Sequence, residues 1–512
     1  MRCLLNGVAW ATITYPIASP LLVNRLLICC VTLCLSLLGY QPLHAASNDL
    51  PDMGTPSSAV LSLEDEYRLG SMVVRGLRDQ GQILDDPELN DYIQSIGLQL
   101  SSQAEQQPAH SFQFHVVKDN EINAFALPGG FICVNAGLLL ATRNESELAG
   151  VLGHEISHVT QRHIARSIIA QSHNGMVSAA AMLAAILLGA AGGGDAAIAG
   201  IAAAQTVALQ NQMSFSRAEE TEADNIGIAL VARSGYDPNG MWQFFEVLER
   251  QNGSRKESDI PAILRNHPVT NERIAETRSR AVHMNPVNHH DSLGYALMRE
   301  RMRVLMTPAG EDPRQYYQFT NKEEKHTSMD QLYGKALADI AAHDAPDAVR
   351  ILKPLIEHDA SVIQYHTALG QAQLEAGDMD ASAATLKHAL ELFPRNIPVT
   401  VRFAETLRRA GDTKKAHSIL LDLFNTVAPT PDQAKLIAIV ANEAGDNADA
   451  YSYMGEYYIM GGDLPTAVAQ YQMALSVPNI TPVQRAKFRA RLEEIQHALP
   501  RRIRPDPEQR GR

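Results

Sequence analysis

The segment Gly150-Val151-Leu152-Gly153-His154-Glu155-Ile156-Ser157-His158-Val159 places two histidines four residues apart, with a glutamate directly after the first. On a helix, residues four apart lie one turn apart on the same face, so His154 and His158 can bind one ion. Glu155 lies between them, offset toward the open side of that ion. A zinc hydrolase needs this arrangement, because two nitrogen ligands hold the metal while a carboxylate takes a proton from water.

A second polar segment, Phe215 to Gly227, should supply the third metal ligand, and three glutamates within it compete. Helical phase groups four of its residues on one stripe: Glu220, Ala223, Asp224 and Gly227. The small residues of this stripe allow a close approach to the histidine helix, where Gly150 and Ser157 are also small.

Glu220 is therefore the predicted third ligand. Asp224, one turn further on, is placed to accept the free N–H of a ligating histidine and so to fix its tautomer. Glu219 and Glu222 fall outside the stripe, and we expect both of them to be solvated.

His267 precedes Pro268 and a helix that contains Arg273. Three roles are open for His267: it can cap the local turn, assist the oxyanion, or occupy the fourth zinc position in a resting form. Arg273 can stabilise the transition state or form a structural ion pair. The remaining candidates are expected to be surface histidines that do not reach the metal: His163, His173, His289 and His290.

The chain has 512 residues, of which 45% are hydrophobic and 20% charged, a globular composition with room for two or three domains. Its formal net charge of −13 argues against a nucleic-acid-binding surface and against tight electrostatic attachment to an anionic membrane.

The N-terminus, residues 1–46, has the pattern of a signal peptide. Arg25 precedes an apolar run from Leu26 to Gly39, and small residues allow cleavage after Ala45 or Ala46. The alternative is an anchor that is never removed, but a run of about 14 residues is short of the ~20 that span a bilayer. Because a long segment precedes Arg25, translation can begin downstream of Met1. The pattern predicts export to the periplasm.

Four of the five cysteines fall in this leader, so the mature chain keeps Cys133 and can form no internal disulfide. Cys133 lies in an apolar strand and is predicted to be an inert core residue.

Residues 47–284 are predicted to form an α+β domain. Ser62 to Gln103 reads as two helices, and strand patterns follow at Phe112–Val117 and Phe131–Val134 around the turn Pro128-Gly129-Gly130. His115, in the alternating first strand, is expected to face solvent. Asn144 or Ser146 can cap the histidine helix.

The segment 175–210 has Asp195 as its single charged residue and is rich in alanine and glycine. Three interpretations are open: a buried helical hairpin, a membrane span cut short at Gly192-Gly193-Gly194, or a mobile lip over the site or an apolar patch that touches lipid or a partner. Peripheral membrane contact through this segment is therefore one possibility that the sequence raises.

After a linker-like stretch at 285–328, residues 329–497 repeat. His343-Asp344, Gly377-Asp378, Gly411-Asp412 and Gly445-Asp446 follow one another at intervals of 34 residues. This period, with helix–turn–helix patterning, is typical of tetratricopeptide repeats, which stack into a solenoid with a concave surface. A basic tail, 498–512, is predicted to be disordered. The expected fold is mainly α: an α+β zinc metallopeptidase domain with a small sheet, followed by an α-solenoid.

These motifs together resemble the zinc metallopeptidase family of the HtpX heat-shock peptidase and the CAAX prenyl endopeptidase. The resemblance is strongest to the soluble periplasmic branch that carries C-terminal tetratricopeptide repeats, the beta-barrel assembly-enhancing type. It covers about residue 60 to the end of the chain. The segments that carry it appear in the family's order: Asn123–Gly130, His154–His158, Glu220–Asp224 and His267-Pro268.

The resemblance implies a peptidase that acts on unfolded or misassembled outer-membrane proteins, with a chaperone-like role beside proteolysis. It also implies that the repeats contact the outer-membrane beta-barrel assembly machinery, and it favours a place near the metal for His267.

The hypothesis from the residues is one Zn²⁺ held by His154, His158 and Glu220, with a fourth position for water. Glu155 would take a proton from that water and deliver it to the leaving amine. The substrate would pair with an edge strand near Ile122–Phe125 or near Phe131–Val134.

Two other classes of function are open. In one, the peptidase is mostly latent and the chain acts chiefly as a repeat-based binding scaffold or chaperone. In the other, the zinc is structural, which would normally require a fourth protein ligand and would leave Glu155 without a role.

Overall fold

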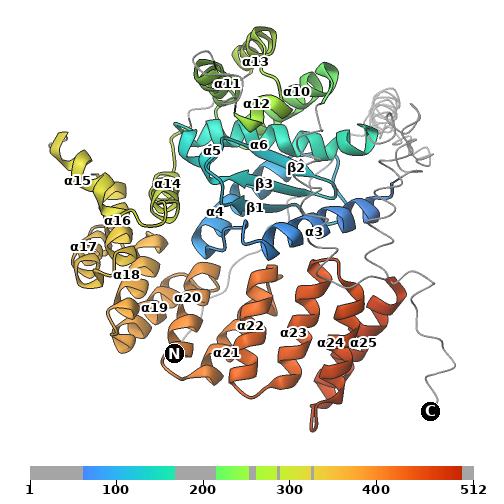
Figure 1. Ribbon diagram of the computed structural model, residues 1–512, viewed down its shortest axis with the longest axis vertical. Coiled ribbons are helices and arrows are strands. Elements are labelled where there is room, and N and C mark those ends of the chain that lie inside the picture. Colours follow the sequence, from blue (N-terminus) through green and yellow to red (C-terminus); the bar gives the residue numbers. More distant parts are fainter. Residues whose placement is uncertain (1–60, 168–214, 253–260, 285–288, 324–327, 499–512) are drawn as a thin grey trace, which may run out of the picture. The chain divides into compact units, whose positions relative to one another are not determined.

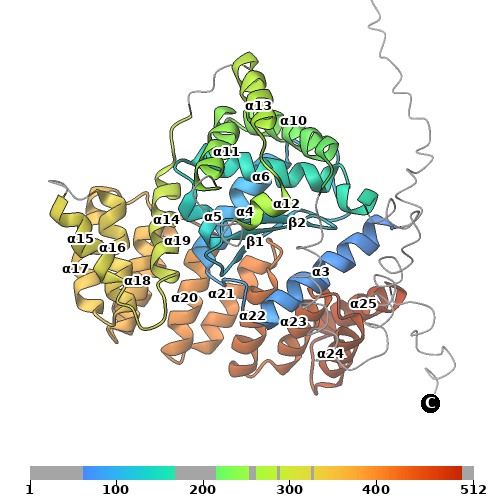
Figure 2. The same cartoon turned by 45° about the horizontal axis from the view of Figure 1, so that its top comes forward.

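The computed structural model describes residues 61–167, 215–252, 261–284, 289–323 and 328–498 (Figures 1 and 2). The predicted signal peptide, the apolar segment 175–210, His173 and the tail beyond 498 lie outside the described residues. Among the described helices, none combines the length and the apolar character needed to cross a membrane.

The N-terminal part surrounds a small sheet with helices, as the α+β pattern predicted (Figure 1). Its elements are α3 (Leu63–Asp79), α4 (Pro87–Ser101), β1 (Gln113–Val117), β2 (Ala124–Leu127), β3 (Phe131–Asn135), α5 (Ala136–Ala141), α6 (Glu145–Thr160), α10 (Arg217–Arg233), α11 (Asn239–Asn252), α12 (Ala262–Asn266) and α13 (Asn271–His283).

The sheet has the strand order β1-β3-β2, with β1 parallel and β2 antiparallel to β3. The central strand is β3, so the prediction that Phe131–Val134 offers a free edge to a substrate is wrong. Strand β2 is an edge of the sheet. Asn123 accepts a hydrogen bond from the Asn135 N–H through its carbonyl, which shows that Asn123, Phe125 and Leu127 turn their backbone groups toward β3. Ala124 and Ala126 therefore turn theirs to the free side.

Both faces of the sheet are covered. Apolar residues of α3 pack on the face that carries Phe125 and Cys133, while α4 and α6 pack on the face that carries Phe114 and Ile132. Cys133 is buried, as predicted. The expectation that His115 faces solvent is wrong, because α3 covers its face of the sheet and buries its ring.

Helices α6 and α10 cross at two glycines. A Cβ on Gly227 would lie 2.9 Å from the carbonyl carbon of Gly153, and a Cβ on Gly153 would lie 3.0 Å from the carbonyl oxygen of Gly227. The predicted small stripe on α10 is thus used, but its partner on α6 differs from the prediction. Gly150 instead faces Met241 of α11, and Ser157 donates to the Gly153 carbonyl within its own helix.

The repeat part consists of antiparallel helix pairs (Figure 2). Its helices are α16 (Met329–Ala341), α17 (Ala345–His358), α18 (Ile363–Glu375), α19 (Met379–Leu392), α20 (Ile397–Arg409), α21 (Thr413–Phe424), α22 (Pro431–Glu443), α23 (Asn447–Met460), α24 (Leu464–Ser476) and α25 (Pro482–Ala498). The Gly-Asp pairs of the repeats lie at the turns. Gly411, for example, has φ +83°, and Asp412 caps α21 by accepting from the Lys415 N–H.

The stretch predicted as a linker contains two helices, α14 (Leu293–Leu305) and α15 (Arg314–Glu323). Arg301 of α14 donates to Asp86 at 2.7 Å and lies 2.9 Å from Glu88, next to α4. Arg402 of α20 donates to Glu88 at 2.8 Å. The two guanidinium groups and the two carboxylates are buried or nearly so, and they connect the N-terminal part, α14 and the repeats.

Candidate metal centre

Helix α6 carries the histidine motif in a buried position. Asn144 caps the helix by accepting from the Glu147 N–H at 2.8 Å, which selects it over Ser146 as the cap. Every residue of α6 is buried, so His154, Glu155 and His158 are held away from water by the sheet on one side and α10 and α11 on the other.

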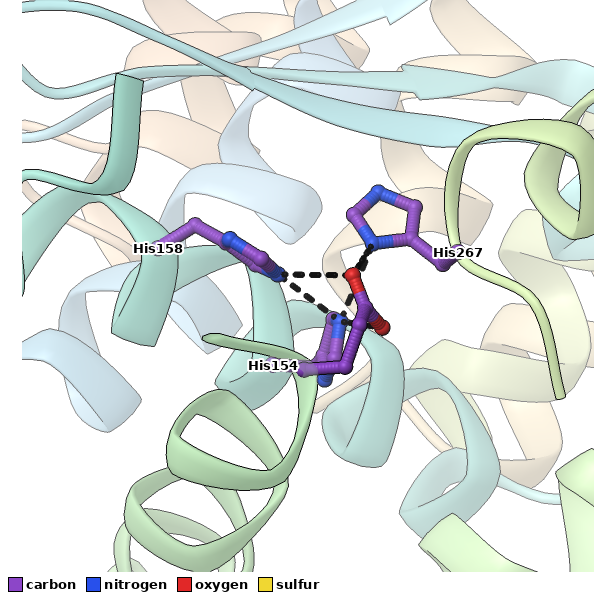
Figure 3. Close-up of side chains that lie close together, drawn as sticks. His154, His158 and His267 are labelled. Carbon is purple, nitrogen blue, oxygen red and sulfur yellow. Dashed lines mark hydrogen bonds and ion pairs between the residues drawn. The ribbon is translucent and has the colours of Figure 1, made fainter. Parts of the chain in front are cut away.

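The ring nitrogens of His154, His158 and His267 point toward one another (Figure 3). Glu220 Oε1 lies 3.7 Å from His158 Nε2. His154 Nε2 lies 3.0 Å from His158 Nε2 and 3.5 Å from Glu220 Oε2. His267 Nδ1 lies 2.8 Å from Glu220 Oε1 and 3.3 Å from His154 Nε2. One donor atom from each of the four residues falls within 4.8 Å of the others. The crossing at Gly153 and Gly227 brings Glu220 to the two histidines.

His154 is oriented from behind by a buried carboxylate. Its Nδ1 lies 2.9 Å from Asp224 Oδ1, and Arg273 donates to both oxygens of Asp224 at 2.8 Å. Burial alone would raise the pKa of Asp224, but hydrogen bonds from His154 and Arg273 lower it to about 2. An ionised Asp224 accepts a hydrogen bond from the Nδ1–H of His154, so the lone pair of His154 Nε2 faces the cluster.

Arg273 also lies 2.7 Å from Glu220 and donates to the Pro268 carbonyl at 2.8 Å, while its guanidinium stacks over Phe245. The polar contacts are all with the protein's own carboxylates and backbone. Of the two roles left open for Arg273, the structure shows the ion pair.

His158 is supported by another histidine. His163 Nδ1 lies 2.9 Å from His158 Nδ1, and the His163 side chain is completely buried, so its assignment as a surface histidine is wrong. Glu222, expected to be solvated, is only partly exposed and pairs with His163 and Arg166. Phe215 covers the His158 ring at a centroid distance of 4.1 Å.

Glu155 extends from α6 to the edge of the sheet. Its Oε2 accepts from the Ala126 N–H at 2.9 Å, whereas its Oε1 has no hydrogen-bond partner in the described part of the chain. Burial raises the pKa of Glu155, and the neighbouring His267 and His154 oppose that rise. A carboxylate held by one oxygen and free at the other can take up and release a proton at a fixed position.

His267 ends α12, and its ring enters the cluster. Its Nε2 lies 3.6 Å from Glu155 Oε1, so the ring touches both carboxylates of the site. Burial would lower the pKa of His267, but Glu220 and Glu155 outweigh it and raise the pKa to about 9. A pocket of about 20 Å³ adjoins the ring and is lined largely by apolar side chains that include Val151, Phe244 and Ile263.

The donor set fits a zinc ion. His154 Nε2 and His158 Nε2 lie 3.0 Å apart, close enough for their lone pairs to bind one ion. Burial, together with the neighbouring rings, holds the pKa of His158 well below its usual value, so the ring is neutral, as a metal-ligating imidazole must be. Imidazole nitrogens with one carboxylate are the ligands that zinc takes in hydrolases.

Comparison with known proteins identifies the family of the chain. The profile of peptidase family M48 matches residues 87–281, and a tetratricopeptide-repeat profile matches residues 373–440. The chain is 30% identical to the beta-barrel assembly-enhancing protease of Escherichia coli K12 over 472 residues, which cover 91% of this chain and 94% of that protein. The protein of the same name from Yersinia pestis is also 30% identical, over 89% of this chain and 93% of its own length.

A third relative matches a smaller share of the chain. The mitochondrial metalloendopeptidase OMA1 of Schizosaccharomyces pombe is 33% identical over 166 residues, or 32% of this chain and 44% of that protein. With similarity of this kind along nine-tenths of its length, the chain belongs to peptidase family M48, as a metallopeptidase whose catalytic part is followed by tetratricopeptide repeats.

Proposed function

We propose that this metallopeptidase is a zinc-dependent endopeptidase of the periplasm that degrades unfolded or misassembled outer-membrane proteins. The observation that carries the proposal is the buried set of four donor atoms beside Glu155. The substrate class is supported by relatives named for enhancing beta-barrel assembly, because barrels of this kind are outer-membrane proteins. Export follows from the leader predicted at 1–46.

In the working form His154, His158 and Glu220 would hold the zinc ion. A bound zinc ion polarises the scissile carbonyl and lowers the pKa of water to ~7. Glu155 is the general base, because its unpartnered Oε1 lies beside the cluster, 3.6 Å from His267 Nε2, while the Ala126 N–H fixes its Oε2. The same oxygen then returns the proton to the leaving amine. Asp224 keeps His154 in the ligating tautomer.

The free side of β2 is the proposed backbone-binding strand for the substrate. Ala124 directs its N–H and C=O to this side, and the Ala126 N–H on the same side is bound to Glu155. The outward carbonyl of Ile122, two residues earlier, already accepts a hydrogen bond from the Ile263 N–H, so α12 limits the strand at that end. Pairing through backbone groups suits unfolded chains of varied sequence.

The form described here is proposed to be a resting form. With His267 in place, four protein donors surround one point, and a catalytic zinc site keeps one position open. His267 must therefore withdraw before substrate and water enter. The closed set of donors also favours the second candidate function, in which a mostly latent peptidase serves chiefly as a repeat-based scaffold or chaperone.

The repeats are proposed to contact the beta-barrel assembly machinery, and peripheral membrane contact through 175–210 stays a prediction. Part of the repeat surface is occupied by the peptidase itself, since Asp432 and Asp463 pair with Arg78 and Arg75 of α3. A partner must therefore bind repeat surface that these contacts leave open.

Glu155→Gln tests the proposal. Purified wild-type chain should cleave an unfolded outer-membrane barrel protein and contain one zinc ion per chain. The variant should keep the zinc ion and the bound substrate but lose cleavage by more than about 100-fold, as expected for a general base. Cleavage that persists in the variant would remove Glu155 from the mechanism. Normal barrel assembly in cells that carry the inactive variant would favour the scaffold.

A further inference from the structure

The chain reverses direction directly after the histidine helix. Helix α6 ends at Thr160, and Arg162 takes φ +54°, in the left-handed region. This conformation costs a non-glycine residue about 1 kcal/mol. Two contacts hold it: Arg162 Nε donates to Glu66 Oε1 at 2.9 Å, and its second terminal nitrogen donates to the Leu61 carbonyl at 2.7 Å. The turn places His163 against the back of His158.

Both ring nitrogens of His163 are used. Nδ1 faces His158 Nδ1 at 2.9 Å, and Nε2 faces Glu222 Oε2 at 3.1 Å. The same oxygen of Glu222 accepts from Arg166 at 3.0 Å. His163 is not one of the four residues of the metal cluster, and its hydrogen bond to that cluster is the one to His158.

The position of each proton follows from Glu222. An ionised carboxylate only accepts hydrogen bonds, so a neutral His163 carries its proton on Nε2 and a lone pair on Nδ1. That lone pair accepts from His158, whose proton must then be on Nδ1. The lone pair of His158 is left on Nε2, which is the nitrogen that faces the metal cluster. The opposite arrangement would direct an N–H of His158 into the cluster and prevent ligation.

We infer that His163 is a positioning residue, which together with Glu222 fixes His158 in the tautomer and orientation that bind the metal. The inference rests on the proposed zinc site and adds two residues, His163 and Glu222, that orient one of its ligands. The two ligating histidines are held differently. His154 is bound to the buried ion pair of Asp224 and Arg273. The hydrogen-bonded chain behind His158 ends at Glu222, whose side chain is 37% exposed.

The experiment measures zinc affinity in the full-length chain by competition with a chelating dye. His163→Phe keeps a planar ring in the buried site but removes both hydrogen bonds, and it should weaken zinc binding by about 10- to 100-fold. His163→Gln offers an amide oxygen to His158 and an N–H to Glu222, so it should recover most of that loss. His115→Phe is the matched control, since it exchanges another buried histidine for phenylalanine in β1, and its zinc affinity should equal that of the wild type.

Glu222→Gln provides a test at a partly exposed position that does not endanger folding. An amide can donate as well as accept, so the tautomer is no longer fixed, and zinc affinity should fall several-fold. Unchanged affinity in His163→Phe or in Glu222→Gln would overturn the inference. An equal loss in His163→Phe and His163→Gln would also overturn it, because packing alone would then explain the effect. A wild-type chain that binds no zinc would instead refute the proposed function.

Discussion

Glycine has two different tasks in the two halves of this molecule. At the crossing of α6 and α10, Gly227 has an ordinary helical backbone, and it is the neighbouring helix that leaves no room for a side chain. At the repeat turns, Gly411 has open space around its Cβ position, but its φ of +83° disfavours any other residue. The first glycine is required by a contact, the second by its own conformation.

This difference determines how far the structural effect of a substitution extends. A change at the crossing moves one helix against another, and the metal cluster takes its ligands from both. A change at a repeat turn stays local, because each repeat contacts chiefly its neighbours and the array has many similar turns. We therefore expect the same substitution to have unequal effects in the two regions.

Gly227→Ala should have the largest effect. The new Cβ would lie 2.9 Å from the backbone nitrogen of His154 and from the Gly153 carbonyl carbon. Backbone atoms cannot rotate away as a side chain can. The helices must separate, which should lower the free energy of unfolding by about 3 kcal/mol and weaken zinc binding by more than about 100-fold.

Gly411→Ala is the matched control for that variant. It should lower the free energy of unfolding by about 0.5 kcal/mol, because about 1 kcal/mol of left-handed strain is half offset by the lower freedom of the unfolded chain, and leave zinc affinity unchanged. Urea unfolding and chelator competition on both variants measure the contrast. Equal zinc affinities in the two variants would show that the crossing does not set the geometry of the site.

Glu88→Gln tests whether the two regions depend on each other at their junction. Glu88 lies between Arg301 of α14 and Arg402 of α20, and the variant leaves both cations short of a negative charge. We expect a loss of about 2–3 kcal/mol in the free energy of unfolding at pH 7, with zinc affinity unchanged.

The pH dependence gives a second readout for that junction. Burial would raise the pKa of Glu88, but Arg301 and Arg402 outweigh it and lower the pKa to about 2, from an ordinary value of 4.5. Between these values the folded chain binds fewer protons than the unfolded one, so the stabilisation is complete above about pH 4.5 and is lost as the pH falls toward 2. The difference between wild type and Glu88→Gln should shrink over the same range. A difference that stays constant would assign the effect to packing.

The sequence predicted those features that depend on spacing within one helix or one repeat. The phase of α10 selected Glu220 and Asp224, which the structure brings to the histidines, and the 34-residue period located the repeat turns. Both are periodic signals in which each residue's position follows from its neighbours in the chain.

Features that depend on the path of the chain were missed. No glycine marks the left-handed turn at Arg162, which is held by the distant Glu66, so the sequence gives no sign that His163 packs against His158. His115 was assigned to solvent because an alternating strand reads as one with an open face, whereas α3 covers that face. In both cases the deciding contact comes from α3 or its flank, far away in the sequence.

His343→Gly should have the smallest effect, and it should be a gain. His343 stands where later repeats have glycine, with φ +61°, and its N–H donates to the Ile340 carbonyl as the Gly377 N–H does to the Leu374 carbonyl. Glycine would relieve about 1 kcal/mol of left-handed strain but lose about half of that to the greater freedom of the unfolded chain. A net gain of about 0.5 kcal/mol in urea unfolding is expected, and Gly411→His should lose a similar amount. If both changes destabilise, the His343 side chain must make a contact worth more than the strain, and the turns could not be treated as equivalent.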